Sequence, residues 1–339
     1  MSSTLVTGGA GFIGSHVAEN LVKSGHEVVV LDDLSGGFKD NLVEGIDFVQ
    51  GSVNDVKLVN ILFERRQFDY VFHLAAYAAE GLSHFIKRFN YNNNLIGSVN
   101  LINASINTGV KCFVFTSSIA VYGASPELPM TEETRPHPED PYGIAKLAVE
   151  QELAVCKQMF DLDTIIFRPH NVYGERQNIG DKYRNVVGIF MNQILQGKPM
   201  TIFGDGTQTR AFSYIGDVAP IIEKSVYVPE AYNQVFNIGA DQPYSVNELA
   251  ISVATAMGAA PDILHVPARN EVEHAYSSHE KIQRIFGKRD PYTLEDGLAR
   301  MAHWVKQHGA RASQEFEGIE VEKNFPAAWR SKSQLKIVQ

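Results

Sequence analysis

The chain has 339 residues, of which 44% are hydrophobic and 20% charged, and its formal net charge is −9. This is the composition of a folded globular protein, and the length suggests about two structural units. An acidic chain without a basic stripe is not expected to bind nucleic acid, although a few local arginines can still serve a phosphate.

The first half of the chain alternates strand patterns with helix patterns. Short apolar runs without polar alternation are typical of parallel strands that are buried on both faces. Strands are expected at residues 3–7, 27–32, 47–50, 70–74, 112–117 and 164–168, and helices at 12–24, 53–67, 90–108 and 142–160. This order predicts an α/β fold, a Rossmann-type doubly wound parallel sheet with helices on both faces.

After about residue 170, glycine and asparagine become frequent, and helices are expected at 186–196, 216–226, 246–257 and 278–286. We therefore predict a Rossmann domain over residues 1–170. A smaller mixed α/β substrate-binding region is expected over residues 171–310, with chain crossings back to the sheet. Residues 311–339 carry no long pattern and are expected to form a C-terminal tail, pinned by Phe325 and Trp329.

The two cysteines, Cys112 and Cys156, each lie in an apolar stretch. They are interpreted as reduced core thiols rather than a disulfide or a zinc site, and no metal is expected. No apolar run reaches the 18 residues of a membrane span. The N-terminus lacks the basic and apolar regions of a signal peptide, so we expect a cytoplasmic protein that does not contact membranes.

A glycine-rich turn separates the first predicted strand from the first helix. Gly8, Gly11 and Gly14 allow a tight turn, close approach of a pyrophosphate, and close packing of helix on strand. The start of the helix adds free N–H groups for phosphates. The second predicted strand ends in Asp32, near the usual spacing of about 20 residues for an acid that binds the adenosine ribose. A carboxylate there would repel a 2′-phosphate, so NAD is favoured over NADP.

Tyr142 and Lys146 are one helical turn apart and therefore share a helix face. A phenol with a pKa of about 10 is a poor base at neutral pH, and a nearby ammonium stabilises the phenolate. Ser118 follows a predicted strand, at the edge of the sheet where open parallel sheets bind ligands. Ser118, Tyr142 and Lys146 are the candidate catalytic residues.

With these motifs, the chain resembles the extended short-chain dehydrogenase/reductase family, and within it the nucleotide-sugar epimerases of the UDP-glucose 4-epimerase type. The resemblance covers about residues 3–310. Besides the glycine-rich turn, it rests on His73-Leu74-Ala75-Ala76, on Ser117-Ser118 before Val121-Tyr122-Gly123, on Pro141-Tyr142-Gly143 with Lys146, and on Arg168-Pro169-His170-Asn171-Val172-Tyr173-Gly174.

The resemblance implies a role for each matching residue. Tyr142 would be the general base, Lys146 would bind the nicotinamide ribose and lower the tyrosine pKa, and Ser118 would hydrogen-bond the reacting sugar hydroxyl. The expected cofactor contacts are Gly8, Gly11, Phe12, Ile13, Gly14, Asp32, Ser52, Val53, Leu74, Ala75, Ala76, Asn94, Tyr142 and Lys146. The expected contacts to the substrate, a nucleotide-diphosphate sugar with UDP as the favoured nucleotide, are Ser118, Tyr142, Asn171, Asn185, Val186, Arg210, Arg269 and Ala275.

Several of these residues have a second interpretation. The resemblance implies that Asn94 supports the site and that Asn171 contacts the diphosphate. Alternatively, both side chains only form hydrogen bonds with backbone groups. Arg210 and Arg269 suit a phosphate, although Arg269 could be a solvated surface residue. Two isolated histidines, His73 and His170, are interpreted as packed or hydrogen-bonded residues.

The sequence departs from the family pattern at three positions. Ser52 follows Gly51 where the family usually has an acid that touches adenine, and Ala211 replaces the aspartate that usually follows the first phosphate arginine. Glu80 is an unusual acid near the expected nicotinamide end, or else a loop residue that faces water.

The reaction is inferred from the residues after Ser118. Dehydratases that resemble this chain carry an Asp-Glu pair there to eliminate water, and the related decarboxylases carry Glu at the second position. This chain has Ile119 and Ala120, which cannot move protons. The absence of these two acids favours an NAD-dependent 4-epimerase that acts through a 4-keto intermediate. Its expected substrates are UDP-hexoses, with UDP-N-acetylhexosamines or UDP-uronates as wider options. The alternatives are a dehydratase or ketoreductase of the same family, with Glu80 as the second acid, and, more remotely, a non-catalytic NAD sensor.

Two further expectations come from the resemblance. The family implies a homodimer in which the helices 90–108 and 142–160 of each copy form a four-helix contact. In the 4-epimerase relatives, one side chain near sugar C2 decides whether an N-acetyl group fits, and spacing from Glu271 matches it to Ala275. A small residue there would admit N-acetylhexosamines. A one-residue slip would place Tyr276 there instead, and ordinary strand packing is the other interpretation.

Overall fold

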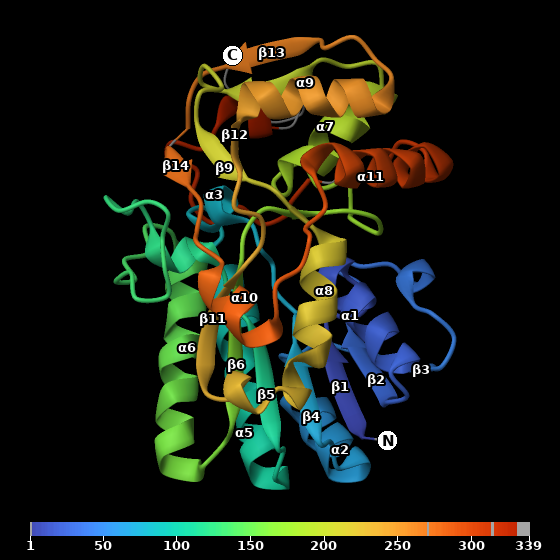
Figure 1. The fold of residues 1–339 in the computed structure, drawn as a ribbon, viewed down its shortest axis with the longest axis vertical. Helices are drawn as coiled ribbons and strands as arrows, with labels where there is room; N and C mark the ends of the chain where they lie inside the picture. The colour runs from blue at the N-terminus through green and yellow to red at the C-terminus, as the bar shows by residue number, and fades with distance from the viewer. Residues whose placement is uncertain (1, 270, 313–314, 331–339) are drawn as a thin grey trace.

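The structure is a computed structural model that describes residues 2–269, 271–312 and 315–330. At its centre lies a seven-stranded parallel sheet with the strand order β11-β6-β5-β4-β1-β2-β3 (Figure 1). The chain starts in the middle of the sheet, builds one edge through β2 and β3, and then builds the other through β4, β5 and β6. This doubly wound order confirms the predicted fold class. The strands are β1 (Ser3–Thr7), β2 (Glu27–Asp32), β3 (Ile46–Gln50), β4 (Tyr70–His73), β5 (Cys112–Thr116), β6 (Thr164–Pro169) and β11 (Gln234–Ile238).

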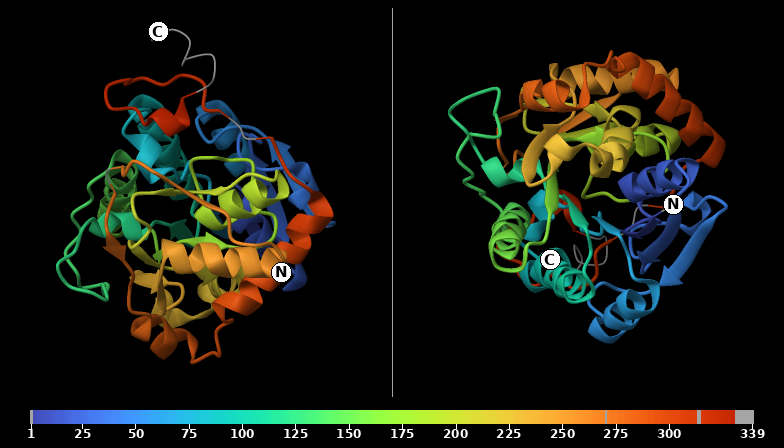
Figure 2. Two further views of the ribbon diagram at one scale, coloured as in Figure 1. Left: turned by 90° about the horizontal axis from the view of Figure 1, so that it is seen from above. Right: turned by 60° about the horizontal axis from the view of Figure 1, so that its bottom comes forward.

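Helices cover both faces of the sheet (Figure 2). On one face α1 (Phe12–Lys23) contacts α8 (Ile215–Lys224), and on the other α5 (Gly97–Thr108) contacts both α2 (Val56–Arg66) and α6 (Pro141–Phe160). Alternate strand residues divide between the two cores. Burial on both faces explains why the strands have the continuous apolar sequences that predicted them. Val6, Val28 and Val30 pack on the α1 side, whereas Leu5, Val29 and Leu31 pack on the α2 and α5 side.

The helix expected over residues 90–108 is divided in the structure. A short helix α4 (Lys87–Tyr91) leads into a π-helical segment, η2 (Asn92–Ile96), and then into α5. π-Helical turns are rare and occur often at functional sites. The segment carries Asn94, whose side chain bonds to the chain beside the cofactor end of the sheet.

A smaller region of helices and short strands covers the carboxyl ends of the central strands (Figure 1). Its short sheets pair β10 with β7, β13 with β8, and β9 with both β12 and β14. β11 returns from this region to pair with β6. Its elements are β7 (Val172–Tyr173), α7 (Val186–Leu195), β8 (Met200–Phe203), β9 (Thr209–Ala211), β10 (Ser213–Tyr214), β12 (Pro243–Ser245), α9 (Val246–Met257), β13 (Ile263–Val266), β14 (His274–Ala275), α10 (Glu280–Phe286) and α11 (Leu294–His308). The short helix α3 (Glu80–Ser83) follows β4, and 3-10 turns occur at η1 (Lys39–Asn41), η3 (Ile119–Tyr122), η4 (Ser225–Tyr227), η5 (Pro229–Ala231) and η6 (Ala327–Trp329).

After α11 the chain runs back along the molecule and crosses the segment that contains α3 and α4, as the view from above shows (Figure 2). We call residues 315–330 the C-terminal strap. Phe325 and Trp329, the two residues expected to pin the tail, are both buried there. Of the tail expected at 311–339, residues 313–314 and 331–339 lie outside the described residues.

Within the described residues both cysteines are buried and unpaired, as the sequence predicts. No helix in the same part of the chain has the length and apolarity needed to cross a bilayer.

Candidate active site

The glycine-rich turn lies at the carboxyl end of β1, where the structure leaves no room for side chains. A Cβ atom on Gly14 would lie 2.1 Å from the carbonyl oxygen of Gly8, and one on Gly8 would lie 2.7 Å from the backbone of Ala75. Gly8 also has a φ of +69°, which favours glycine. Among the residues that the structure describes, no side chain caps the first N–H groups of α1. The turn therefore fits a dinucleotide diphosphate, which would take up these free donors.

Asp32 is held at the end of β2 by two backbone hydrogen bonds. Its carboxylate accepts from the N–H groups of Ala10 at 3.0 Å and Leu34 at 2.8 Å. Burial raises the pKa of Asp32, and the backbone donors act in the opposite direction. A carboxylate so fixed still has oxygen lone pairs for ribose hydroxyls. Ser52, which replaces the usual acid, also lines this end of the cleft.

Tyr142 is fixed in the first turn of α6 by the helix cap. The carboxylate of Asp140 accepts from the N–H groups of Tyr142 and Gly143, both at 2.9 Å, and Pro141 begins the helix. Across the cleft the Ser118 hydroxyl accepts from the N–H of Ala120 at 3.1 Å, and it lies near enough to the Tyr142 phenol to act on the pKa of that phenol. Serine and tyrosine are thus neighbours at the end of β5.

Lys146 lies behind this pair. Its ammonium donates to the carbonyl of Thr116 at 2.7 Å and lies 5.7 Å from the centre of the Tyr142 ring. Burial lowers the pKa of Lys146 to about 7. The pKa of Tyr142 lies above its usual value, because burial and the nearby carboxylate of Glu80 both disfavour the phenolate. This net direction is opposite to the lowering of the tyrosine pKa that the resemblance implies for Lys146.

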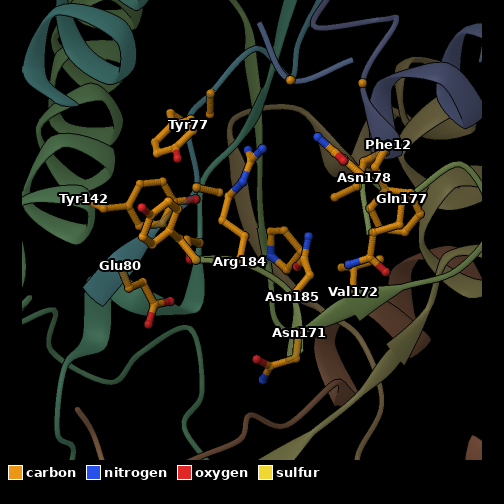
Figure 3. A pocket seen from close by; sticks show the side chains of 18 of the residues that line it. Phe12, Tyr77, Glu80, Tyr142, Asn171, Val172, Gln177, Asn178, Arg184 and Asn185 are labelled. Atoms are coloured by element: carbon orange, nitrogen blue, oxygen red, sulfur yellow. The ribbon is translucent and has the colours of Figure 1, made fainter. Parts of the chain in front are cut away.

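Glu80 begins α3 and lines the cleft on the same side as Tyr142 (Figure 3). The Glu80 side chain is open to the solvent of the cleft, but desolvation by the surrounding cleft walls and the neighbouring Asp140 raise its pKa to about 7, and Arg210 and Arg269 act in the opposite direction. The Glu80 carboxylate therefore interacts both with the tyrosine and with the two arginines. Within the described residues no hydrogen bond or ion pair engages it.

The expected phosphate-binding arginines lie on the Glu80 side of the cleft, where a Cβ atom on Gly81 would be 3.8 Å from the guanidinium of Arg269. Arg269 pairs with Glu271 at 2.9 Å. Arg210 donates to the carbonyl oxygens of Thr209 and Glu273, each at 2.8 Å. Both guanidinium groups border the cleft, so they can reach a ligand there. The arrangement suits a diphosphate, which planar guanidinium groups bind through paired hydrogen bonds.

The cleft contains all but two of the predicted cofactor and substrate residues. Asn94 is the first exception. It is buried, and it accepts from the N–H of Tyr77 at 2.8 Å and donates to the carbonyl of the same residue at 3.1 Å. It holds the wall of the cleft through these bonds, and its contact with the cofactor stays a prediction.

Ala275 is the second exception. It lies in β14 opposite Arg210 and packs against a cluster that includes Val121 and Met130. This placement favours the alternative of ordinary strand packing over a contact of Ala275 with the sugar. The pairing register of β14 on β9 gives Ala275 this position.

Other residues of the cleft were missed. Arg184 projects into its middle (Figure 3), with its guanidinium 4.6 Å from the centre of the Tyr77 ring and 2.7 Å from a carboxylate oxygen of Asp181. Tyr77 directly follows the His-Leu-Ala-Ala motif, which was a usable signal, whereas no motif marked Arg184. Further lining residues that were not predicted are Gln177, Asn178, Tyr183 and Phe203.

Residues 4–239 match the NAD dependent epimerase/dehydratase family. The chain belongs to this family. The match confirms the resemblance seen in the sequence, and with it the dependence on NAD. No group of His, Cys, Asp and Glu side chains that could hold a metal occurs in the described ranges.

Individual relatives match this chain over nearly the whole of their own length. The chain is 34% identical over 311 residues to a UDP-glucose 4-epimerase of Mycolicibacterium smegmatis, covering 89% of this chain and 98% of that protein. The structure of the Thermotoga maritima UDP-glucose 4-epimerase with UDP-glucose superposes with a TM-score of 0.84 at 34% identity, covering 90% and 99% of the two chains. That of the Thermus thermophilus UDP-glucose 4-epimerase with NAD superposes with a TM-score of 0.83 at 34% identity, covering 89% and 98%.

Proposed function

We propose that the protein is an NAD-dependent 4-epimerase of UDP-hexoses. The observation that carries this proposal is the placement of Ser118, Tyr142 and Lys146 together in one cleft that also contains two arginines for a diphosphate. The relatives that act on UDP-glucose support the choice of nucleotide and sugar.

The mechanism follows from these positions. Tyr142, as a phenolate, takes the proton of the sugar 4-hydroxyl, directly or through Ser118. When bound, NAD would supply an acceptor for the hydride of C4, would give that hydride back to the opposite face of C4, and would add a cationic nicotinamide ring that favours the phenolate. Arg210 and Arg269 hold the diphosphate while the 4-keto sugar turns its other face to the same site. Tyr142 then returns its proton to the sugar oxygen, so the reaction ends with the configuration at C4 inverted.

A simple epimerisation agrees with the residues after Ser118. Ile119 and Ala120 are apolar and buried, so they offer no acid to eliminate water or to protonate a carbon. A dehydratase would need its second acid elsewhere in the cleft, and Glu80 is the described residue best placed to provide it. This observation keeps a dehydratase as the second candidate.

Proton NMR of the purified enzyme with a panel of UDP-sugars separates these reactions. We expect UDP-glucose to be converted to a mixture with UDP-galactose, without a change in mass. A 4-keto-6-deoxy sugar would instead establish the dehydratase. A nicotinamide absorbance that never changes and a sugar that is never altered would indicate an NAD sensor and contradict the proposal.

We also propose that the protein forms a homodimer through α5 and α6. Ile144, Val155 and Met159 lie along one side of α6 and are exposed, Met159 by 69%. Such a stripe of exposed apolar side chains is typical of an interface. Light scattering should give twice the chain mass, and Met159→Glu should shift the protein toward monomer. The cytoplasmic location remains a prediction.

A further inference from the structure

The C-terminal strap contacts one of the two phosphate-binding arginines. The guanidinium of Arg269 lies 4.6 Å from the centre of the Phe203 ring and 5.6 Å from the centre of the Trp329 indole. The two rings meet edge to face, with centroids 6.1 Å apart. Arg269 and Phe203 line the substrate cleft, and buried Trp329 stands behind them. The planar cation is therefore bordered by two aromatic rings, one of which belongs to the strap.

Hydrogen bonds attach the C-terminal strap to the rest of the protein at two places, one at Glu320 and one at Trp329 itself. The Glu320 carboxylate accepts from the N–H groups of Arg88 at 2.8 Å and Phe89 at 3.1 Å, at the start of α4. At the other end, the Lys182 ammonium donates to the carbonyl of Trp329 at 3.0 Å. These bonds connect residues far apart in the sequence, and they fix the strap against the wall of the substrate cleft.

The same indole also packs on the segment that carries Glu80. A Cβ atom on Gly81 would lie 3.1 Å from the Trp329 ring, so the absence of a side chain at Gly81 allows this close approach. Trp329 further meets the ring of Tyr183, a cleft residue, edge to face at 5.3 Å. One side chain of the strap thus contacts three separate parts of the cleft wall.

We propose that the C-terminal strap is part of the sugar-nucleotide site, in which Trp329 is a positioning residue that orients Arg269 toward the diphosphate. The inference rests on the proposed function, because it takes a UDP-sugar as the ligand. Arg269 and the strap both lie beyond residues 4–239, the part of the chain that matches the family model, so the family motifs give no signal for this contact.

The first experiment compares Trp329→Ala with Trp329→Phe, in the enzyme loaded with NAD. Removing the ring should weaken UDP binding, measured by calorimetry, by about tenfold, the effect of losing one partly desolvated cation–aromatic contact. KM for UDP-glucose should rise by a similar factor while kcat stays within about twofold, because the diphosphate is held equally in the ground and transition states. Trp329→Phe keeps a ring and should restore most of the affinity. Trp304→Phe, on α11 and stacked on His308, is the matched control and should change neither quantity.

A second experiment keeps Trp329 in place, in case its removal prevents folding. In Trp304→Phe the indole of Trp329 is the one tryptophan that remains, and its fluorescence should change as UDP is added. In Trp329→Phe the emission of Trp304 should not change. If Trp329→Ala binds UDP as tightly as the unmutated enzyme does, or if the emission of Trp329 does not change when UDP binds, the role of Trp329 is wrong. Either result would leave the proposed function standing. An unmutated enzyme that binds no UDP would overturn the proposed function and this inference with it.

Discussion

The carboxylate of Glu80 lies close enough to the phenol of Tyr142 to raise its pKa, and the two side chains border the same end of the cleft (Figure 3). A negative charge beside a phenol opposes the formation of a phenolate. Glu80 itself has a pKa of about 7, so its charge changes near neutral pH. Glu80, an acid that departs from the family pattern, can therefore shift the pKa of Tyr142, the proposed base.

Glu80→Gln should change the pH dependence of kcat/KM in a defined direction. Below pH 7 Glu80 is mainly protonated, so the substitution should have little effect. Above pH 7 the carboxylate is ionised and disfavours the phenolate, so its removal should raise kcat/KM there. Glu139→Gln, an exposed residue of the same cleft, is the control. A fall of activity in Glu80→Gln at every pH would indicate that Glu80 takes part in the chemistry instead.

Tyr142→Phe should reduce turnover by about 10²–10⁴-fold, the usual contribution of a general acid–base group. The substitution removes the hydroxyl and leaves the ring in the first turn of α6, so the fold and the bound NAD should be retained. Turnover of UDP-glucose and the NAD content of the purified variant are the two measurements. Near-normal turnover would exclude Tyr142 as the base.

Lys146→Met should impair turnover and weaken NAD binding, because the ammonium stands behind the phenol and beside the predicted nicotinamide ribose. The pKa of Lys146 is about 7, so its charge is present below that pH and is lost as the pH rises through it. The loss caused by the substitution should therefore be larger at pH 6 than at pH 8. Lys157→Met, on the surface end of the same helix, should behave like the unmutated enzyme. A loss that is the same at both pH values would contradict the role of the charge.

Asp32→Ala should weaken the binding of NAD and reduce the preference of the enzyme for NAD over NADP. The substitution removes the fixed carboxylate that repels a 2′-phosphate. Binding of each cofactor to the apoenzyme is the measurement. Asp33→Ala is a close control, since Asp33 is exposed and bonds only the local N–H of Ser35 among the described residues. If the unmutated protein binds both cofactors equally, the basis for this specificity is wrong.

The sequence predicts those parts of the protein whose signal is local. The apolar strands, the glycine turn and the one-turn spacing of Tyr142 and Lys146 each lie within a few residues, and the structure places them as expected. The parallel topology then brings the ends of β1, β4 and β5 to one edge, because that is where such strands must end. The cleft could therefore be located without coordinates.

The remaining features depend on tertiary contacts that have no local pattern. Arg184 enters the cleft from a loop before α7, and Trp329 reaches Arg269 from the far end of the chain. The π-helical segment breaks a stretch whose apolar spacing predicted one continuous helix. Each of these features is fixed by partners distant in the sequence, so periodicity and motif spacing could not reveal them.

The position of Ala275 gives the last prediction. Because β14 pairs with β9 so that Ala275 lies opposite Arg210, its methyl group packs toward Val121 and Met130 and does not line the sugar cleft. Ala275→Tyr should therefore act as an overpacking substitution and lower the free energy of unfolding by about 1–3 kcal/mol. It should leave the ratio of turnover with UDP-N-acetylglucosamine to turnover with UDP-glucose unchanged. Thermal unfolding and the two kinetic measurements test this, with Val272→Tyr, at a residue that does line the cleft, as the contrasting variant. A selective loss of the N-acetylated substrate in Ala275→Tyr would show that Ala275 does face the sugar.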